Sequence, residues 1–520
     1  MKMKKLYLGL LASVAVLTSS CDMDTTNFGV IDQSNYIETM SDCQAFVNGM
    51  YVHMRSKTGG YYMFYPDVQM DQFIGLVDNA NRGGIMQTGQ IRPGDTDMAD
   101  MYYNMYIAIN DANFFIPRVE KLIESGEFSD ADVELLKYYK GTAHFERAYA
   151  YWYLFDKYVN YDASQLDVEG KGLQLQKEFQ PTGNRKDYVG RSSIKETVAY
   201  ITEQLSEAYD LIKEYETNVS TQYCNPNSAR VSSYVVAALW ARFALLCEDY
   251  KTAGEKAELV INSEKYELTP FDEYVSMWTN DEGSELLFVP WAEQGNGGQG
   301  IGENYLRNNQ KNSSDYIPTA DALLAYGDGD IRFDAFFELY NPMTVQGVDY
   351  LAYAFNKYPG NPVLNSGSTN ALLNKAKPFR LSEQYLIAAE AYSVSSNLNA
   401  AKANQYLNAL RAARIDGYEE ETLSGSALVN AVREERGKEL IGEGFRLSDL
   451  RRWGNGMTRE AGYDMFEGTN MAVLSYIMEG IGAQFNNVHY DANDYRFVWP
   501  IPTREMQVNP QLTGQQNPNY

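Results

Sequence analysis

The chain has 520 residues and a net charge of −25. An acidic protein of this kind repels nucleic acid and anionic lipid surfaces, so neither is expected as a partner. The length exceeds what one hydrophobic core usually supports, which predicts several domains or a repeat architecture.

The N-terminus has the three parts of an export signal. Lysines among the first five residues supply positive charge, an apolar stretch follows from Leu6 to Leu17, and small residues then precede Cys21. The apolar stretch is too short to cross a bilayer comfortably, which favours a removed signal over a membrane helix. Residues 1–20 are therefore predicted to be a signal peptide, whose removal takes away three lysines and no acid and moves the net charge to −28.

Cys21 stands at the predicted cleavage site and is followed by polar residues. This arrangement resembles a bacterial lipoprotein signal, in which lipid is attached to the cysteine. Two acyl chains suffice for stable anchoring, so the mature chain is expected to be tethered to a membrane surface. Plain secretion with an incidental cysteine is the alternative.

The other cysteines and the histidines are too few for a disulfide framework or a zinc site. After Cys21 only Cys43, Cys224 and Cys247 remain, with no CxxC spacing, and the chain has three histidines. An odd number of cysteines in a long chain argues against a disulfide framework. No cofactor is expected, and the sequence leaves open whether a calcium ion holds a loop.

Several long segments carry helical periodicity. One runs from Ser129 to Tyr158, and four others form two pairs across short turns: Val231–Leu246 with Thr252–Ile261, and Leu381–Ser393 with Ala400–Ala413. Alanines alternate with large aromatic residues, as close helix packing requires. The pairs resemble tetratricopeptide-type hairpins, although generic antiparallel helices remain an alternative because no fixed period is found.

Irregular segments separate the helices. Residues 159–190 are polar, and residues 264–379 are rich in glycine, asparagine, proline and aromatics, with one predicted strand at Glu285–Pro290. We therefore expect a mainly α, single-domain mature chain, residues 21–520, with little β structure. The expected scaffold covers about 36–263 and 380–453, a loop-rich insertion covers about 264–379, and a loop-rich C-terminal segment covers 454–520.

Five motifs in a fixed order identify a family resemblance. They are YYKGTAHFERAY at 138–149, RLSEQYLIAAEA at 380–391, LNALRAAR at 407–414, ERGKEL through EGFRLSDLRRWG at 435–454, and the ending from Trp499 to Tyr520. Together with the lipoprotein signal, they resemble the SusD/RagB family, the outer-membrane nutrient-binding lipoproteins of Bacteroidetes. Asn519 stands where that family usually has glycine.

The resemblance implies a fold and partners. The implied fold is a set of four tetratricopeptide-like helix pairs that support a loop-rich ligand face. The implied partners are a glycan ligand, the outer membrane through the lipid on Cys21, and a SusC-like TonB-dependent transporter that the surface-exposed lipoprotein would cap. Some relatives resemble peptide receptors, so a RagB-like peptide ligand is the alternative.

Most of the charged and glycine-rich motifs have a structural interpretation. Seven charged residues recur at helical spacing, which favours a network of ion pairs between helices over acid–base chemistry. They are Glu435, Arg436, Glu439, Glu443, Arg446, Asp449 and Arg452. Asp330 and Arg332 resemble the D-x-R turn of the family, which implies that Arg332 is the basic partner of Asp330. The glycines from Gly295 to Gly300 satisfy GxGxxG, but no long helix pattern comes after them, which favours a surface loop over a dinucleotide site.

Ligand contacts are expected in two regions, on the basis of the resemblance. Flat aromatic rings stack on the apolar faces of sugars, while amide and charged groups meet the hydroxyls. The candidate residues are Asn79, Asn81, Arg82 and Arg92 in the first region, and Trp291, Tyr305, Arg307, Asn308 and Asn309 in the second. The alternative for Trp291 and Tyr305 is that they pack the loop onto the scaffold. The cluster Tyr61–Tyr65 is expected to be mainly structural.

No sequence pattern singles out a catalytic group. GxSxG and HExxH are absent, and no cysteine–histidine pairing suggests a nucleophile. A pair of acids for glycoside hydrolysis is not excluded, because so acidic a chain always offers some pair. Binding without catalysis is the favoured function, and a surface hydrolase is the less favoured alternative.

Overall fold

The computed structural model describes residues 36–76, 83–306, 314–345, 348–365, 372–459 and 488–520. Within these residues the protein is mainly helical, and its strands form small two-stranded sheets. The predicted fold class, mainly α with little β, is confirmed. Cys21 and the predicted signal peptide lie outside the described residues.

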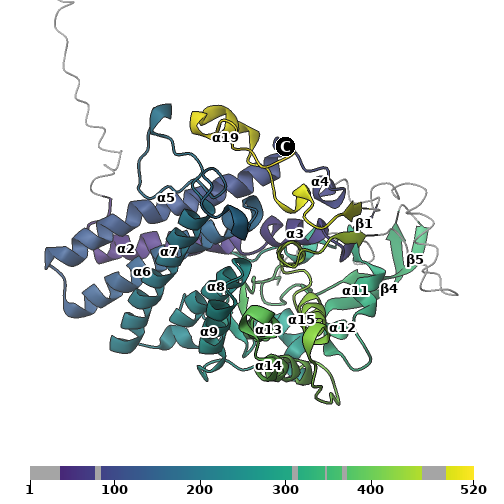
Figure 1. Ribbon diagram of the computed structural model, residues 1–520. Coiled ribbons are helices and arrows are strands. Elements are labelled where there is room, and N and C mark those ends of the chain that lie inside the picture. Colours follow the sequence, from purple (N-terminus) through teal and green to yellow (C-terminus); the bar gives the residue numbers. More distant parts are fainter. Residues whose placement is uncertain (1–35, 77–82, 307–313, 346–347, 366–371, 460–487) are drawn as a thin grey trace, which may run out of the picture.

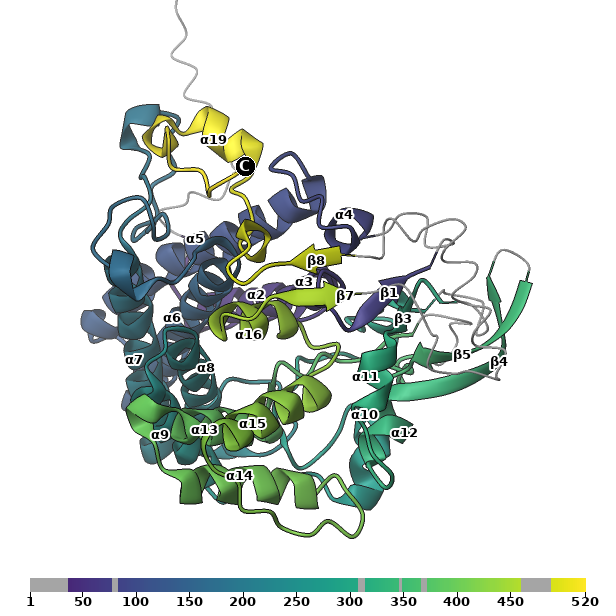
Figure 2. The same cartoon turned by 45° about the vertical axis from the view of Figure 1, so that its right-hand side comes forward.

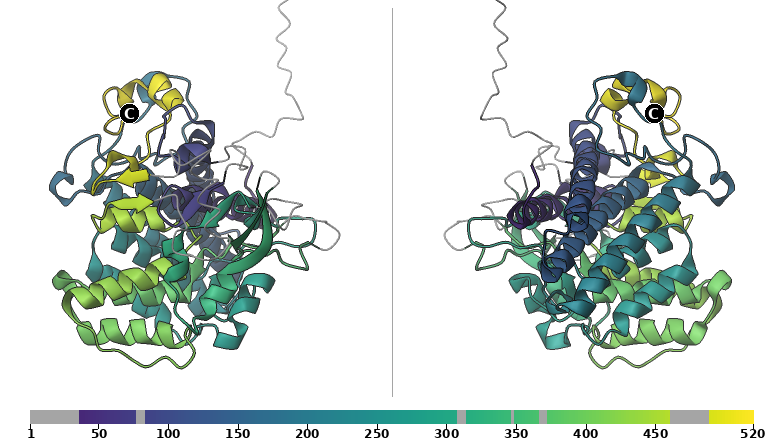
Figure 3. Two further views of the ribbon diagram at one scale, coloured as in Figure 1. Left: turned by 90° about the vertical axis from the view of Figure 1, so that its right-hand side faces the viewer. Right: turned by 90° about the vertical axis from the view of Figure 1, so that its left-hand side faces the viewer.

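The scaffold is a succession of packed helices. α6 packs against α5 and α7, α8 against α7 and α9, and α13 against α9 and α14, while α2 packs against α5 and α6. The helices gather on one side of the molecule, and strands β4 and β5 lie on the other (Figures 1, 2 and 3). The helices that precede the insertion are α2 (Met40–Lys57), α3 (Tyr61–Val68), α4 (Gly84–Gln87), α5 (Thr96–Ser125), α6 (Asp130–Tyr158), α7 (Ile194–Asn218), α8 (Ser233–Leu246) and α9 (Tyr250–Ile261). Those after the insertion are α13 (Leu381–Ser393), α14 (Ala400–Ala412), α15 (Gly425–Glu439) and α16 (Arg446–Arg452).

Caps and small residues explain why these helices begin and pack where they do. Ser129 is the N-cap of α6, and its hydroxyl accepts a hydrogen bond from the Asp132 amide at 3.3 Å, which satisfies an amide that the helix leaves unpaired. A Cβ added to Gly141 would lie 2.9 Å from Cγ1 of Ile212 on α7. The close approach of α6 and α7 therefore requires a residue without a side chain at this position.

The insertion contains more regular structure than its composition predicts. Strand β2 (Leu286–Phe288) confirms the predicted strand and pairs antiparallel with β6 (Phe379–Arg380). The other elements are α10 (Tyr274–Asn280), β3 (Tyr316–Pro318), α11 (Ala320–Leu324), α12 (Ile331–Phe336), β4 (Phe337–Val345) and β5 (Val348–Phe355). The β4–β5 hairpin departs from the expected loop. Its register shifts between Tyr340 and Met343. Pro342 lies in this interval. Because proline has no N–H to donate and is rare inside strands, the sequence pattern here does not predict a strand.

The described residues of the C-terminal segment, 454–459 and 488–520, contain short elements joined by irregular chain. They include β7 (Met457–Arg459) and β8 (Val488–Tyr490), which pair with each other, and α19 (Thr503–Val508). Asn519 has φ of 67°, in the left-handed region that glycine adopts freely and asparagine tolerates better than most residues. The departure from the family's usual glycine is therefore accommodated.

The described part contains no disulfide and no helix suited to cross a membrane. Cys43, Cys224 and Cys247 are buried and free. Burial raises the pKa of the Cys43 and Cys224 thiols to about 12, so both are protonated and unreactive at neutral pH. None of the described helices is long and apolar enough to span a bilayer.

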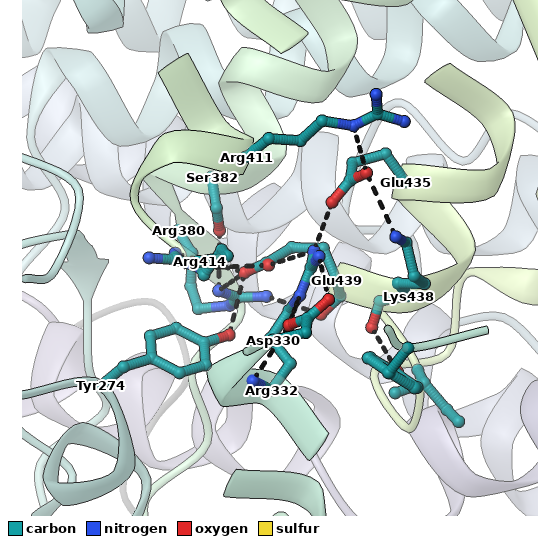
Figure 4. Close-up of polar contacts among 12 residues, drawn as sticks. Tyr274, Asp330, Arg332, Arg380, Ser382, Arg411, Arg414, Glu435, Lys438 and Glu439 are labelled. Atoms are coloured by element: carbon teal, nitrogen blue, oxygen red, sulfur yellow. Dashed lines mark hydrogen bonds and ion pairs between the residues drawn. The ribbon is translucent and has the colours of Figure 1, made fainter. Parts of the chain in front are cut away.

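A buried ionic cluster joins the insertion to the scaffold (Figure 4). Glu439 on α15 lies among three arginines that come from α12, β6 and the end of α14. The ion-pair distances from Glu439 are 3.3 Å to Arg332, 2.8 Å to Arg380 and 3.2 Å to Arg414. The hydroxyl of Tyr274 on α10 donates to Glu439 at 3.0 Å. One carboxylate therefore holds four separate segments of the chain.

Two more carboxylates complete the cluster. Glu285, next to β2, pairs with both Arg380 and Arg414 at 2.6 Å. Glu435 pairs with Arg332 at 2.6 Å and with Arg411 at 2.7 Å. Burial alone would raise the pKa of Glu435, but Arg332, Lys438 and Arg411 outweigh it and lower the pKa to about 2. Glu435 is thus ionised at every physiological pH.

The predicted network of charged pairs is confirmed. All seven residues make ion pairs with described residues, which agrees with the structural role expected for them. The other pairs are Glu443 with Lys357 and with Arg380 of the cluster, Arg436 with Asp449, Arg446 with Asp71, and Arg452 with Asp449 and Glu390. Asp330 also pairs with Arg332 as predicted, at 2.7 Å.

Replacing Glu439 with glutamine tests the ionic cluster. The variant leaves three buried guanidinium groups short of an anion, and breaking a buried pair costs about 3–5 kcal/mol. We therefore expect the free energy of unfolding, measured by chemical denaturation, to fall by about that amount. Glu434→Gln, an exposed change on the same helix, should stay within about 0.5 kcal/mol of the parent protein. Equal stability of the two variants would contradict the role assigned to Glu439.

The stability should also depend on pH through Glu435. Its pKa is about 2 in the folded protein against an ordinary value of 4.5, so its contribution is complete above pH 4.5 and is lost as the pH falls toward 2. Chemical denaturation across this pH range gives the free energy of unfolding of the parent protein and of Glu435→Gln. The difference between the two free energies should become smaller as the pH falls. A difference that stays constant with pH would contradict the lowered pKa.

Candidate ligand-binding site

One part of each predicted ligand region, residues 77–82 and residues 307–313, adjoins the same pair of strands. Strands β1 (Phe73–Gly75) and β3 pair antiparallel, with Gly75 opposite Tyr316. The Leu76 amide donates to the Asp315 carbonyl at 2.8 Å. Leu76, which precedes residues 77–82, and Ser314, which follows residues 307–313, therefore both lie at this end of the strand pair. The candidates Asn79, Asn81, Arg82, Arg307, Asn308 and Asn309 lie outside the described residues.

Trp291 is exposed at the edge of the scaffold. Half of its surface, 50%, is accessible, and no other tryptophan of the described residues is exposed. Its backbone carbonyl accepts a hydrogen bond from Nη1 of Arg55, near the end of α2, at 2.8 Å. The Gln299 side chain in turn donates to the Arg55 carbonyl at 2.5 Å. Arg55 therefore holds both ends of the segment from Trp291 to Gln299 against the scaffold.

The glycine-rich motif within this segment is a turn. Glu293 and Asn296 exchange backbone hydrogen bonds of 2.9 and 3.0 Å. Gly295 has φ of 74° and Gly297 of 86°. The next element is a short 3₁₀ helix, Gly302–Asn304, rather than the long helix that a dinucleotide site requires. The turn instead exposes the side chains of Glu293 and Asn296 beside Trp291.

Tyr305 lies in the core, so the expectation that its ring stacks on a ligand is wrong. It is 1% exposed. Its ring centroid lies 5.3 Å from that of Phe64, 4.9 Å from Phe73 and 4.7 Å from Phe355. An aromatic residue at the foot of a loop gains more free energy by joining these rings than by facing water. Tyr305 thus fastens the loop to the scaffold, as the alternative for this residue predicts.

Tyr61 supplies a second exposed ring near the same segment. It is 38% exposed and stacks on Tyr65 with 4.8 Å between ring centroids. A Cβ added to Gly59, two residues earlier, would lie 2.2 Å from Oε1 of Gln299, so the turn before Tyr61 contacts the Trp291 segment directly. The other rings of the Tyr61–Tyr65 cluster are buried or half-buried, which agrees with the structural role expected for them. The sequence signal for Tyr61, the first residue of α3 after two glycines, is weak.

Arg92 is exposed but belongs to a different neighbourhood. The carbonyl of the adjacent Pro93 accepts a hydrogen bond from the Thr503 amide at 2.8 Å, which places Arg92 beside the C-terminal segment. No contact among the described residues links Arg92 to Trp291. Its predicted role in ligand contact stays a prediction.

The described residues around Trp291 offer chemistry suited to recognition of a ligand. No group of three or more histidine, cysteine, aspartate or glutamate side chains in the described ranges is placed to hold a metal ion. The edge around Trp291 combines a flat ring with exposed carboxylate and amide groups. Such a surface can stack on an apolar face and accept or donate hydrogen bonds around it.

Comparisons with known proteins agree with this architecture. Residues 213–520 match the SusD family, and residues 30–245 match a family described as starch-binding associating with outer membrane. The SusD-like protein P25 of Formosa agariphila is 30% identical over 167 residues, which cover 31% of this chain and 27% of that protein. The chain thus matches only about a quarter of the length of this curated relative.

Solved structures share the fold along nearly the whole chain. A SusD superfamily protein from Bacteroides thetaiotaomicron is 23% identical, with a TM-score of 0.73 over 93% of this chain and 100% of its own. Surface glycan-binding protein A from Bacteroides fluxus is 18% identical, with a TM-score of 0.68 and the same coverage. A laminarin binding SusD-like protein is 19% identical, with a TM-score of 0.64 over 93% of this chain and 100% of its own. With more than half of its length matched by the family, this chain belongs to the SusD family.

Proposed function

We propose that the protein is a non-enzymatic, surface-exposed lipoprotein that captures a glycan and passes it to a SusC-like TonB-dependent transporter. The observation that carries the proposal is the exposed ring of Trp291, fixed by Arg55 at the edge of the scaffold. Membership of the SusD family, whose structural relatives include glycan-binding and laminarin-binding proteins, supports a carbohydrate ligand.

The physical properties of the site suit a sugar. A pyranose ring has an apolar C–H face that packs on an indole, and hydroxyls at its edge that need hydrogen-bond partners. Trp291 offers the flat surface, and the exposed side chains of Glu293 and Asn296 offer acceptors and donors next to it. Arg55 fixes the segment before any ligand arrives, which reduces the entropy lost on binding.

A peptide ligand is not favoured. A receptor for anionic peptide groups would expose unpaired arginines beside the binding surface. Arg55, the arginine at this edge, uses one guanidinium nitrogen to hold the Trp291 carbonyl, and the exposed charge beside Trp291 is the carboxylate of Glu293. An exposed indole beside an acid and an amide matches a neutral polyhydroxylated ligand better.

Delivery to a transporter and attachment to the outer membrane are inferred from the family resemblance. A family described as associating with the outer membrane matches residues 30–245, and the signal before Cys21 provides a lipid attachment point without a membrane-spanning segment. A lipid tether would confine the receptor next to a membrane-embedded partner and raise the effective concentration of each for the other.

The glycan proposal is tested by measuring binding to an array of polysaccharides and peptides. We expect at least one polysaccharide to bind, no peptide to bind, and no new reducing ends to appear during incubation with the bound polysaccharide. Turnover would support the hydrolase alternative, and peptide binding alone would support the RagB-like one.

Trp291→Ala locates the site once a glycan is found. Loss of a stacked indole should raise the Kd by roughly tenfold, since removal of one buried apolar contact costs about 1.5 kcal/mol or more. Trp291→Phe should keep part of the affinity. Tyr495→Ala is the matched control, because Tyr495 is another exposed ring, 40% accessible, on the C-terminal segment. Unchanged affinity of Trp291→Ala in calorimetry would show that the site lies elsewhere.

Cys21→Ala tests the anchor. Without the thiol no lipid can be attached, so the variant should leave the membrane fraction and appear in the soluble fraction of the native host. The measurement is an immunoblot of separated fractions, with Cys43→Ala as the control that keeps the anchor. Retention of Cys21→Ala in the membrane fraction would argue against lipidation.

A further inference from the structure

A groove of about 390 Å³ lies on a different part of the scaffold from Trp291. It is lined by residues of α11, α15 and α16, and also by Gln72 and Thr319. The Thr319 amide donates to the Gln72 carbonyl at 2.9 Å, just beyond the Phe73–Pro318 end of the β1–β3 pair. The predicted ligand segments leave the opposite end of that pair. The residues that line the groove include neither Arg55 nor any residue from Trp291 to Gln299, so the groove is separate from the Trp291 edge.

Arg433 on α15 stands out among the arginines of α15 and α16. It lines the groove but makes no ion pair or hydrogen bond with any described residue, and its Nε is buried without a partner. The other arginines of these two helices each have a carboxylate partner: Arg436 has Asp449 at 2.8 Å, Arg446 has Asp71 at 2.7 Å, Arg451 has Asp156 at 3.1 Å, and Arg452 has Glu390.

The guanidinium of Arg433 is held in place by an aromatic ring. Its central carbon lies 5.1 Å from the ring centroid of Trp453, a distance at which a cation is attracted to an indole. Trp453 is itself fixed, because its Nε1 donates to Glu390 at 2.7 Å. A guanidinium that is oriented in advance and has no carboxylate partner is suited to bind a planar anion through two parallel hydrogen bonds.

The rest of the groove limits which anion fits. Asn430 and Asn455 offer exposed amides, and Asp321 and Glu434 place exposed carboxylates on the rim. These acids, on a protein with a net charge of −25, repel a densely charged polyanion. They also accept hydrogen bonds from hydroxyls. The groove thus suits a ligand unit with one negative charge and several hydroxyl groups.

We propose that this groove is a second sugar-binding site, specific for a uronic acid residue whose carboxylate is bound by Arg433. The inference rests on the proposed glycan-binding function and names an acidic sugar as part of the ligand. A glycan that reaches both this groove and the Trp291 edge would bind more tightly than through either site alone.

Calorimetry with matched oligosaccharides tests the groove. The probes are neutral oligosaccharides that carry a single galacturonic, glucuronic or mannuronic acid residue, and the same oligosaccharides with that carboxylate reduced to a neutral alcohol. The parent protein should bind at least one acidic oligomer about ten- to a hundredfold more tightly than its reduced form, as expected for a charge-assisted bidentate contact. Equal affinity for every acidic and reduced pair, or no binding of any acidic oligomer, would overturn the proposal.

Variants of Arg433 test whether the tighter binding of acidic oligomers comes from the groove. Arg433→Gln should weaken binding of the acidic oligomer by a similar factor and leave binding of neutral glycans unchanged, while Arg433→Lys should recover only part of the loss. Arg185→Gln, which removes an exposed arginine outside the groove, is the matched control, and thermal unfolding verifies that each variant is folded. Acidic binding that is unaffected by both Arg433 changes would overturn the proposal.

These experiments distinguish an error in the groove proposal from an error in the proposed function. If neutral glycans bind through Trp291 and no acidic oligomer depends on Arg433, only the groove proposal fails. If no glycan of either kind binds, the proposed function fails with it.

Discussion

The ionic cluster around Glu439 is the constraint on which the rest of the structure depends. Isolated charges are costly to bury, and only close pairing with excellent geometry offsets that cost. Glu439 meets arginines from three segments that lie far apart in the sequence, so the cluster forms only when these segments meet in one arrangement. It specifies how the insertion sits on the helices, and the hydrophobic core supplies most of the driving force.

A few anchors fix the candidate site to the scaffold. Tyr305 inserts into the rings of Phe64, Phe73 and Phe355, and Arg55 holds the Trp291 segment from α2. The exposed indole is therefore mounted on a segment whose ends are fixed. This arrangement fits a receptor, because a fixed ring binds a ligand with less loss of entropy than a ring on a free loop.

The helices were predictable because their periodicity, caps and small residues are local properties. Leu381–Ser393 is an example in which the predicted and observed bounds agree. The paired charges of α15 were also predictable as structural, although their partners Arg332 and Arg380 are distant in sequence. Tyr305 and the β4–β5 hairpin were not predictable, because burial of one ring and pairing around Pro342 depend on tertiary contacts. Trp291 is exposed and Tyr305 is buried, and no sequence pattern predicts this difference in exposure.

The most direct test of glycan capture at the Trp291 edge is a crystal structure of the protein with its best-binding oligosaccharide. We predict a sugar ring packed against the indole of Trp291, within about 4 Å of its face, with hydroxyls directed toward the turn that contains Glu293 and Asn296. An oligosaccharide bound only on the helical side of the scaffold, with Trp291 free in solvent, would contradict this prediction.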